Sequence, residues 1–61
     1  MYQLQSKDKE IKNSNWITIK KCIRENEIRG YYNNSKKISG HFHYLRIIDK
    51  NNNVMITTED K

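Results

Sequence analysis

The sequence lacks proline and alanine and contains only one cysteine and two glycines among its 61 residues. Because a disulfide needs two thiols, the lone Cys22 excludes such a bond within the chain. With Gly30 and Gly40 as its only glycines, the chain has no glycine-rich loop that could cradle a phosphate. No apolar run reaches the roughly 20 residues of a membrane span, and none at the N-terminus is typical of a signal peptide. We therefore expect a soluble, cytoplasmic protein with no membrane partner.

Lysine, isoleucine and asparagine dominate what is present, with nine, nine and eight residues. This bias is typical of AT-rich coding DNA and points by association to a low-GC bacterium or one of its phages. The net charge is +5, from 12 Lys and Arg against 7 Asp and Glu, and basic residues are spread along the chain. Such a spread favours polyanionic partners through the summed field. It excludes a DNA mimic, which would need dense carboxylates.

The short chain predicts a single small domain over residues 1–61, since a domain of this size buries only about 60% of its unfolded surface. A chain of this length leaves no room for a cofactor domain or a deep catalytic cleft. The secondary structure follows from apolar spacing and turn formers. We predict strands at residues 2–6, 16–21, 42–48 and 54–58, a flexible loop at 7–15, a helix at 26–37 and a turn at 49–53.

The order ββαββ predicts an α+β fold, a single antiparallel four-stranded sheet with one helix packed on one face. Asn26 is the predicted N-cap of the helix, and Gly40 is its predicted stop signal. The face toward the helix is the predicted core. We assign to this inner face His43, Leu45, Ile47, Tyr2, Leu4, Ile17, Ile19, Val54 and Ile56, covered by Ile28 and Tyr31 or Tyr32.

The other face of the sheet is predicted to be unusually apolar, aromatic and basic, although antiparallel sheets normally turn polar residues to water there. A contiguous patch of this kind on a small protein marks an interface. The alternative is that cross-strand aromatic pairs simply stabilise the sheet. The predicted partner-binding residues are Trp16, Lys20, Phe42, Tyr44, Arg46, Ile48 and Met55, with Thr18 and Thr57 between them.

Catalytic and metal-binding side chains are sparse. His41 and His43 point the same way in a strand, but zinc needs a third protein ligand, and no spacing brings Cys22 or Asp49 to them. Cys22 also lacks the pocket and orienting group that a nucleophile requires. We therefore predict that the protein is not an enzyme and holds no metal or cofactor.

The segments "YQLQSKD", "NWITIK" and "YLRIIDKNNNV" resemble those of small ββαββ proteins encoded by phages and prophages of low-GC bacteria. Several tiny phage proteins of this size bind and block a bacterial defence complex such as a CRISPR effector. The resemblance implies an anti-CRISPR-like inhibitor whose partner is a host protein or ribonucleoprotein complex. Trp16, Tyr44 and Arg46 are its predicted hot spots, because such residues dominate interfaces.

Two alternatives remain open at the level of the sequence. An exposed sheet face with Trp16, Tyr44 and Arg46 could stack unpaired bases, which predicts a small protein that binds RNA or DNA. The same face could also join two copies of the chain, sheet to sheet, in a homodimer.

Overall fold

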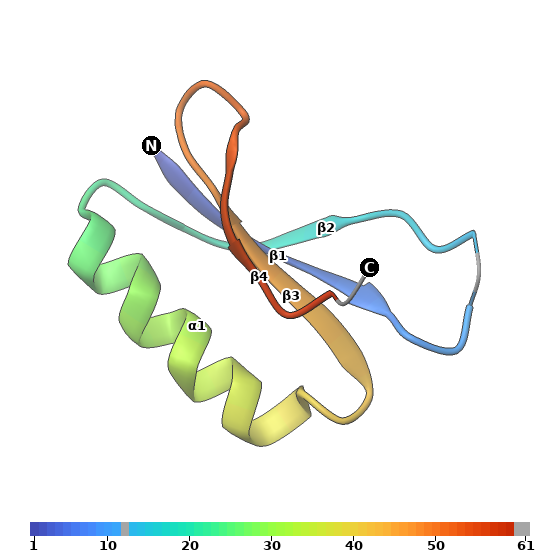
Figure 1. Ribbon diagram of the computed structural model, residues 1–61. Coiled ribbons are helices and arrows are strands. Elements are labelled where there is room, and N and C mark those ends of the chain that lie inside the picture. The colour runs from blue at the N-terminus through green and yellow to red at the C-terminus, as the bar shows by residue number, and fades with distance from the viewer. Residues whose placement is uncertain (12, 60–61) are drawn as a thin grey trace.

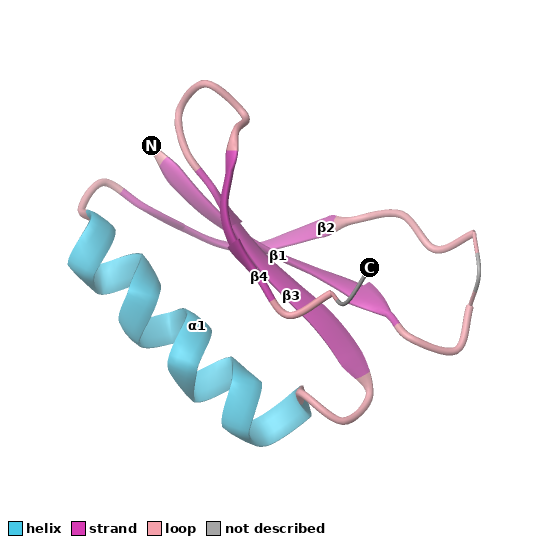
Figure 2. Cartoon of the chain, in the orientation of Figure 1, coloured by secondary structure: helices cyan, strands magenta, loops and turns pink. Residues whose placement is uncertain are grey.

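The computed structural model describes residues 1–11 and 13–59, and these form the predicted α+β fold, with one four-stranded antiparallel sheet and one helix (Figures 1 and 2). The order ββαββ is also as predicted. The elements are β1 (Tyr2–Asp8), β2 (Ile17–Cys22), α1 (Glu25–Ser39), β3 (His43–Ile48) and β4 (Val54–Thr57).

The strands lie in the order β2-β1-β3-β4, so β1 and β3 occupy the centre of the sheet. β2 and β3 both run antiparallel to β1. The connection from β2 through α1 to β3 therefore passes over β1, and it lays the helix across one face of the sheet (Figure 1). Because no second helix exists within the described residues, the opposite face has no covering layer there.

Charged side chains near both ends of α1 and a C-terminal cap explain where the helix begins and ends. Glu25 and Glu27 occupy its first turn and Lys36 and Lys37 its last, where the helix dipole favours each sign. Gly40 caps the C-terminus as predicted, and its N–H donates to the carbonyl oxygen of Lys36. The predicted start was wrong in detail: the helix begins at Glu25, so Asn26 lies inside the first turn and does not cap it.

The core fills the space between α1 and the centre of the sheet. Four of its side chains are fully buried, each no more than 1% exposed: Leu4, Ile28, Leu45 and Ile47. Tyr32 completes the helical side of this core, and burial raises the pKa of its hydroxyl. Predicted inner positions Tyr2 and Ile56 also pack against these residues. Cys22, which sequence reasoning did not place in the core, is buried there as a small apolar side chain.

A β-bulge between β1 and β2 changes the predicted faces of β2. Leu4 pairs with Lys20 but Gln5 pairs with Thr18, so Ile19 is an extra residue. Lys20 and Cys22 consequently turn toward the helix side of the sheet. Ile17 and Ile19, predicted for the core, are instead 65% and 50% exposed. Ile17 pairs with Ser6 and keeps its predicted side of the sheet, but it begins the edge strand and is left exposed there, whereas Ile19 is the bulge residue itself.

A second bulge, between β3 and β4, makes a similar correction. Ile47 pairs with Ile56 but Ile48 pairs with Val54, which leaves Met55 as the extra residue. Met55 therefore packs against the core, although it was predicted to lie on the outer face. Val54, predicted for the core, is 49% exposed.

The turn between β3 and β4 is held by hydrogen bonds to the side chain of Asp49. In the turn between β3 and β4, Asp49 Oδ1 accepts from the N–H groups of Asn51 and Asn53 at 2.8 and 3.0 Å. Asn52 has a positive φ of 64°, which Asn tolerates better than most residues. These two hydrogen bonds lower the pKa of the Asp49 carboxyl below its ordinary value.

The loop between β1 and β2 is shorter than predicted, because Lys7 and Asp8 belong to β1. Its described residues are tied to the sheet: the Lys9 N–H donates to the Phe42 carbonyl at 3.1 Å, and the Asp8 N–H donates to Ser14 Oγ at 3.3 Å. Lys12, in the middle of this predicted loop, lies outside the described residues. In the part of the chain described, no helix has the length and apolar character needed to cross a membrane.

Candidate binding face

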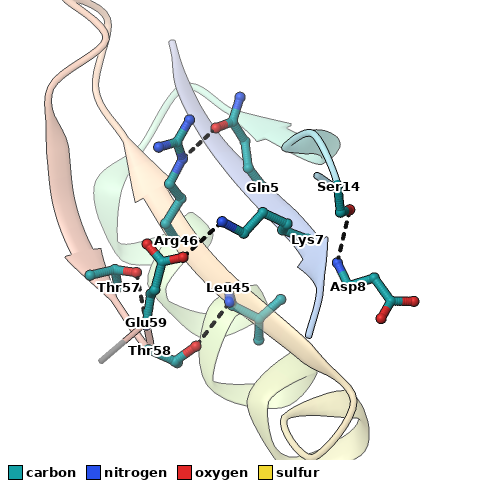
Figure 3. Close-up of polar contacts among 9 residues, drawn as sticks. All are labelled: Gln5, Lys7, Asp8, Ser14, Leu45, Arg46, Thr57, Thr58 and Glu59. Atoms are coloured by element: carbon teal, nitrogen blue, oxygen red, sulfur yellow. Dashed lines mark hydrogen bonds and ion pairs between the residues drawn. The ribbon is translucent and has the colours of Figure 1, made fainter. Parts of the chain in front are cut away.

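The face of the sheet opposite α1, called the open face below, is set by the strand register. Gln5 lies beside Arg46 and Thr18, and Lys7 lies beside Tyr44, so these side chains share one side of the sheet. Figure 3 shows Gln5, Lys7, Arg46 and Glu59 projecting toward the viewer with the helix behind the sheet. The open face comprises Gln3, Gln5, Lys7, Trp16, Thr18, Lys21, Tyr44, Arg46, Ile48, Val54, Thr57 and Glu59.

Cations and aromatic rings alternate across this face. The guanidinium of Arg46 lies 4.3 Å from the centroid of the Trp16 ring. Lys7 Nζ lies 5.1 Å from the Trp16 ring and 5.8 Å from the Tyr44 ring, so one ammonium joins both aromatics. Lys9 Nζ lies 5.3 Å from the Tyr44 ring. All four contacts are within the roughly 6 Å over which a ring attracts a cation.

A row of side-chain hydrogen bonds crosses the same face from β3 to β2. Arg46 Nε donates to Gln5 Oε1 at 2.7 Å (Figure 3). Gln5 Nε2 donates to Thr18 Oγ1 at 3.2 Å. Thr18 Oγ1 in turn donates to Gln3 Oε1 at 2.9 Å. Arg46 is therefore held at two points, by the amide of Gln5 and by the ring of Trp16, and its orientation is fixed before any partner arrives.

The residues after β4 close one edge of this arrangement. Thr58 exchanges hydrogen bonds with the backbone of Leu45, each at 2.9 Å, and so keeps the chain beside β3. This places Glu59 over the open face, where its carboxylate accepts from Lys7 Nζ at 2.8 Å (Figure 3). Within the described residues Arg46 forms no ion pair, although Glu59 lines the same hollow.

A hollow of about 350 Å³ lies on the open face beside the aromatic and basic side chains. It is surrounded by an aromatic ring, a guanidinium group, the methyl groups of Val54 and Thr57, and a carboxylate. The lining residues are Trp16, Arg46, Val54, Thr57 and Glu59. A hollow with this lining can accept one amphipathic side chain from a partner, with apolar contact to the ring and polar contact at the rim.

Three of the seven predicted partner-binding residues are brought together: Trp16, Tyr44 and Arg46. Lys20 lies elsewhere, because the first bulge turns it toward α1, where its Nζ is 4.6 Å from the Tyr31 ring. Phe42 precedes β3 in the turn after the helix and is 64% exposed. The placement of Lys20 on the open face was therefore wrong, and Phe42 lies just outside the strand predicted to carry it.

The other two predicted residues are buried to different degrees. Ile48 is on the open face by its register with Gln3, yet it is only 5% exposed and offers little area to a partner. Met55 contacts the core, as described above. The predicted contiguous apolar patch is therefore wrong, and the face is a mixed aromatic, basic and amide surface.

Sequence reasoning missed Gln5, Lys7 and Glu59 as members of this surface. The alternation of residues 2–6 contained the signal for Gln5, since it lies opposite to Leu4. The polar neighbours of Lys7 predict a loop, whereas the structure places Lys7 in β1. Glu59 could not be found from sequence, because only the path of the chain after β4 brings it to Lys7.

The candidate metal ligands are dispersed. Cys22 is buried at the end of β2, His41 is exposed in the turn before β3, and Asp49 uses its carboxylate within the hairpin turn. Across residues 1–11 and 13–59, no group of three His, Cys, Asp or Glu side chains is positioned to hold a metal ion.

Comparisons of the chain with protein-family models, with characterised proteins and with solved structures found no match. The role of the open face therefore has to be inferred from the chemistry of its own side chains.

Proposed function

We propose that this protein is a non-enzymatic binding protein that uses its open face to occupy, and thereby block, a surface of a host macromolecular complex. The observation that supports this proposal is the preorganised group of Trp16, Tyr44 and Arg46 beside a hollow of about 350 Å³. Trp, Tyr and Arg are the residue types that carry most binding energy at protein interfaces.

The fixed positions of these side chains favour binding energetically. Immobilising a flexible side chain at an interface costs about 0.5–1.5 kcal/mol. Arg46 has already lost this freedom through its contacts with Gln5 and Trp16. A partner that presents a carboxylate to Arg46 and an apolar group to the hollow would gain these contacts at a reduced entropic cost.

The size of the protein suits a mechanism of occupancy. A standard interface removes about 800 Å² from each partner, and this chain exposes 4733 Å² in total. One face of the sheet can supply the required sixth of that surface. The resemblance of the sequence to small phage proteins supports a bacterial defence complex, such as a CRISPR effector, as the target.

A second candidate function is binding of single-stranded RNA or DNA on the same face, where Lys7, Lys9 and Arg46 would contact phosphates. The same cations, however, also lie over the aromatic rings on which bases would stack. The guanidinium of Arg46 already covers the Trp16 ring at 4.3 Å, so a base stacking on that side would have to displace it. This favours a protein surface as the partner of the open face.

The test is quantitative capture of partners from a nuclease-treated lysate of a low-GC bacterium. The double variant Tyr44→Ala/Arg46→Ala removes the anchors, and Arg29→Ala/Ile38→Ala removes one basic and one apolar side chain from the exposed surface of α1. We expect the first variant to lose a protein that the wild type and the second variant both retain. Equal capture by all three proteins would contradict the proposal, and loss of all capture on nuclease treatment would favour the nucleic-acid function.

A further inference from the structure

A second surface with different chemistry lies between the end of β2 and the start of α1. It is a groove of about 680 Å³, called the basic groove below, and it falls within the roughly 300–1,000 Å³ of ligand sites. The lining residues are Met1, Lys20, Lys21, Cys22, Ile23, Arg24, Glu27 and Tyr31.

Positive charge dominates the basic groove. Lys20, Lys21 and Arg24 line it against a single carboxylate, Glu27. The ion pairs found within residues 1–11 and 13–59 join Lys7 to Glu59 and Arg29 to Glu25, so none of the three groove cations is neutralised there. Walls of low dielectric constant focus the field of such charges into the concavity, which attracts an anionic ligand.

Tyr31 and Glu27 line both the basic groove and a neighbouring hollow on α1. Lys20 Nζ lies 4.6 Å from the centroid of the Tyr31 ring, which fixes the cation at the boundary between the two. The neighbouring hollow has a volume of about 510 Å³ and is lined by Asn26, Glu27, Gly30, Tyr31 and Asn34. It is roomy because a Cβ atom at Gly30 would meet no atom within 4 Å.

These two adjoining sites match the two parts of a nucleotide. Phosphate groups are bound by Lys and Arg side chains, which the basic groove supplies. Unpaired bases are recognised by stacking on aromatic rings and by hydrogen bonds to their edges. Tyr31 is 45% exposed, and because Lys20 lies over one side of its ring, a base would have to stack on the other side. The carboxamides of Asn26 and Asn34 carry both donors and acceptors.

We propose that the basic groove and the neighbouring hollow together bind a single-stranded nucleic acid, with backbone phosphates against Lys20, Lys21 and Arg24 and a base against Tyr31. Lys20 lies on the helix side of the sheet, whereas Lys21 pairs with Gln3 on the open-face side. The site therefore wraps around the edge strand β2 and shares only Lys21 with the open face. A protein bound to the open face and a single-stranded nucleic acid bound near the start of α1 would together suit a ribonucleoprotein target.

The experiment is fluorescence anisotropy with a labelled 12-nucleotide uridine or thymidine strand, titrated at several salt concentrations. The triple variant Lys20→Gln/Lys21→Gln/Arg24→Gln is compared with Lys36→Gln/Lys37→Gln/Lys50→Gln, which removes the same charge elsewhere. Three lost phosphate contacts should lower the slope of log affinity against log salt by about 2, at about 0.7 per contact. We expect at least a tenfold loss of affinity at low salt for the groove variant, and less than a threefold loss for the control.

A third variant tests the base contact and does not depend on the folding of the triple variant. Tyr31→Leu keeps an apolar side chain at an exposed position but removes the stacking surface. It should weaken binding about tenfold, from the one to three kcal/mol that a stacked base contributes, and should leave the salt slope unchanged. Tyr44→Ala/Arg46→Ala should bind the strand like the wild type, whether or not the open face binds a protein.

Three results would overturn the inference. Equal loss in the two triple variants would mean that the field of the whole protein attracts the strand. Binding of a DNA duplex or inorganic polyphosphate as tightly as the single strand would mean that no base is recognised. Absence of any binding at 20 mM salt would remove the site altogether.

Discussion

The contact between Trp16 and Arg46 gives the sharpest test of how the open face is organised. If the ring and the guanidinium interact at 4.3 Å as described, their substitutions should not be additive. The perturbations are Trp16→Leu, which removes the aromatic ring, and Arg46→Met, which removes the charge and keeps an unbranched apolar stem. Combined in one chain, they complete a double-mutant cycle.

The expected magnitudes follow from the contacts of each side chain. Arg46→Met removes a charged hydrogen bond to Gln5 and a cation–π contact. The first contributes about 1 kcal/mol at a half-exposed site, and the second contributes about 0.5–1 kcal/mol. We therefore expect Arg46→Met to lower the free energy of unfolding by about 1.5–2 kcal/mol. The coupling energy of the cycle should be about 0.5–1 kcal/mol, because it isolates the cation–π contact.

The assay is equilibrium unfolding in urea, followed by far-ultraviolet circular dichroism at two salt concentrations. A matched cycle between Trp16 and Arg29 serves as the control, because Arg29 lies on α1 and pairs with Glu25. A coupling energy below about 0.3 kcal/mol for Trp16 and Arg46, equal to that of the control, would refute the organised open face, since distant sites add to within that error.

Three further predictions concern the fold. Ile28→Ala, at a side chain with no exposed area, should cost about 2–5 kcal/mol, visible as loss of cooperative thermal unfolding; a melting temperature within 5 °C of wild type would contradict it. Gly30→Ala should stabilise the protein by up to about 1 kcal/mol and raise its melting temperature by several degrees, because the added Cβ would meet no other atom. Gly40→Ala should instead lower the stability of the folded protein, because its Cβ would meet the backbone of Lys36. Because the pKa of Asp49 is lowered in the folded protein, its contribution is present above about pH 4 and lost on further acidification; Asp49→Asn should flatten the acid limb of stability against pH, and an unchanged limb would refute this.

The order of elements and the centre of the core were predictable because both depend on local spacing. Leu4, Leu45 and Ile47 occupy positions of one parity in their strands and so share a face, and Ile28 and Tyr32 lie about one helical turn apart. These patterns survive small errors in the ends of elements, so the predicted core was correct at its centre.

The two β-bulges explain most of the errors. A bulge adds one residue to a strand and reverses the faces beyond it, and nothing in the sequence of β2 or β4 marks its position. Lys20 therefore moved from the predicted open face to the basic groove, and Met55 moved to the core. The ion pair of Lys7 with Glu59 was also out of reach, because it joins residues 52 positions apart.

Site-specific photocrosslinking tests most directly the claim that the open face contacts the partner. A photoreactive amino acid would replace Thr57, which is exposed and lines the hollow on that face, or Asn33, which is exposed on α1. In a nuclease-treated lysate of a low-GC bacterium, we predict a protein crosslink from position 57 that the Tyr44→Ala/Arg46→Ala substitutions abolish, and none from position 33. Crosslinks from position 33 alone, or from both positions regardless of those substitutions, would contradict the account.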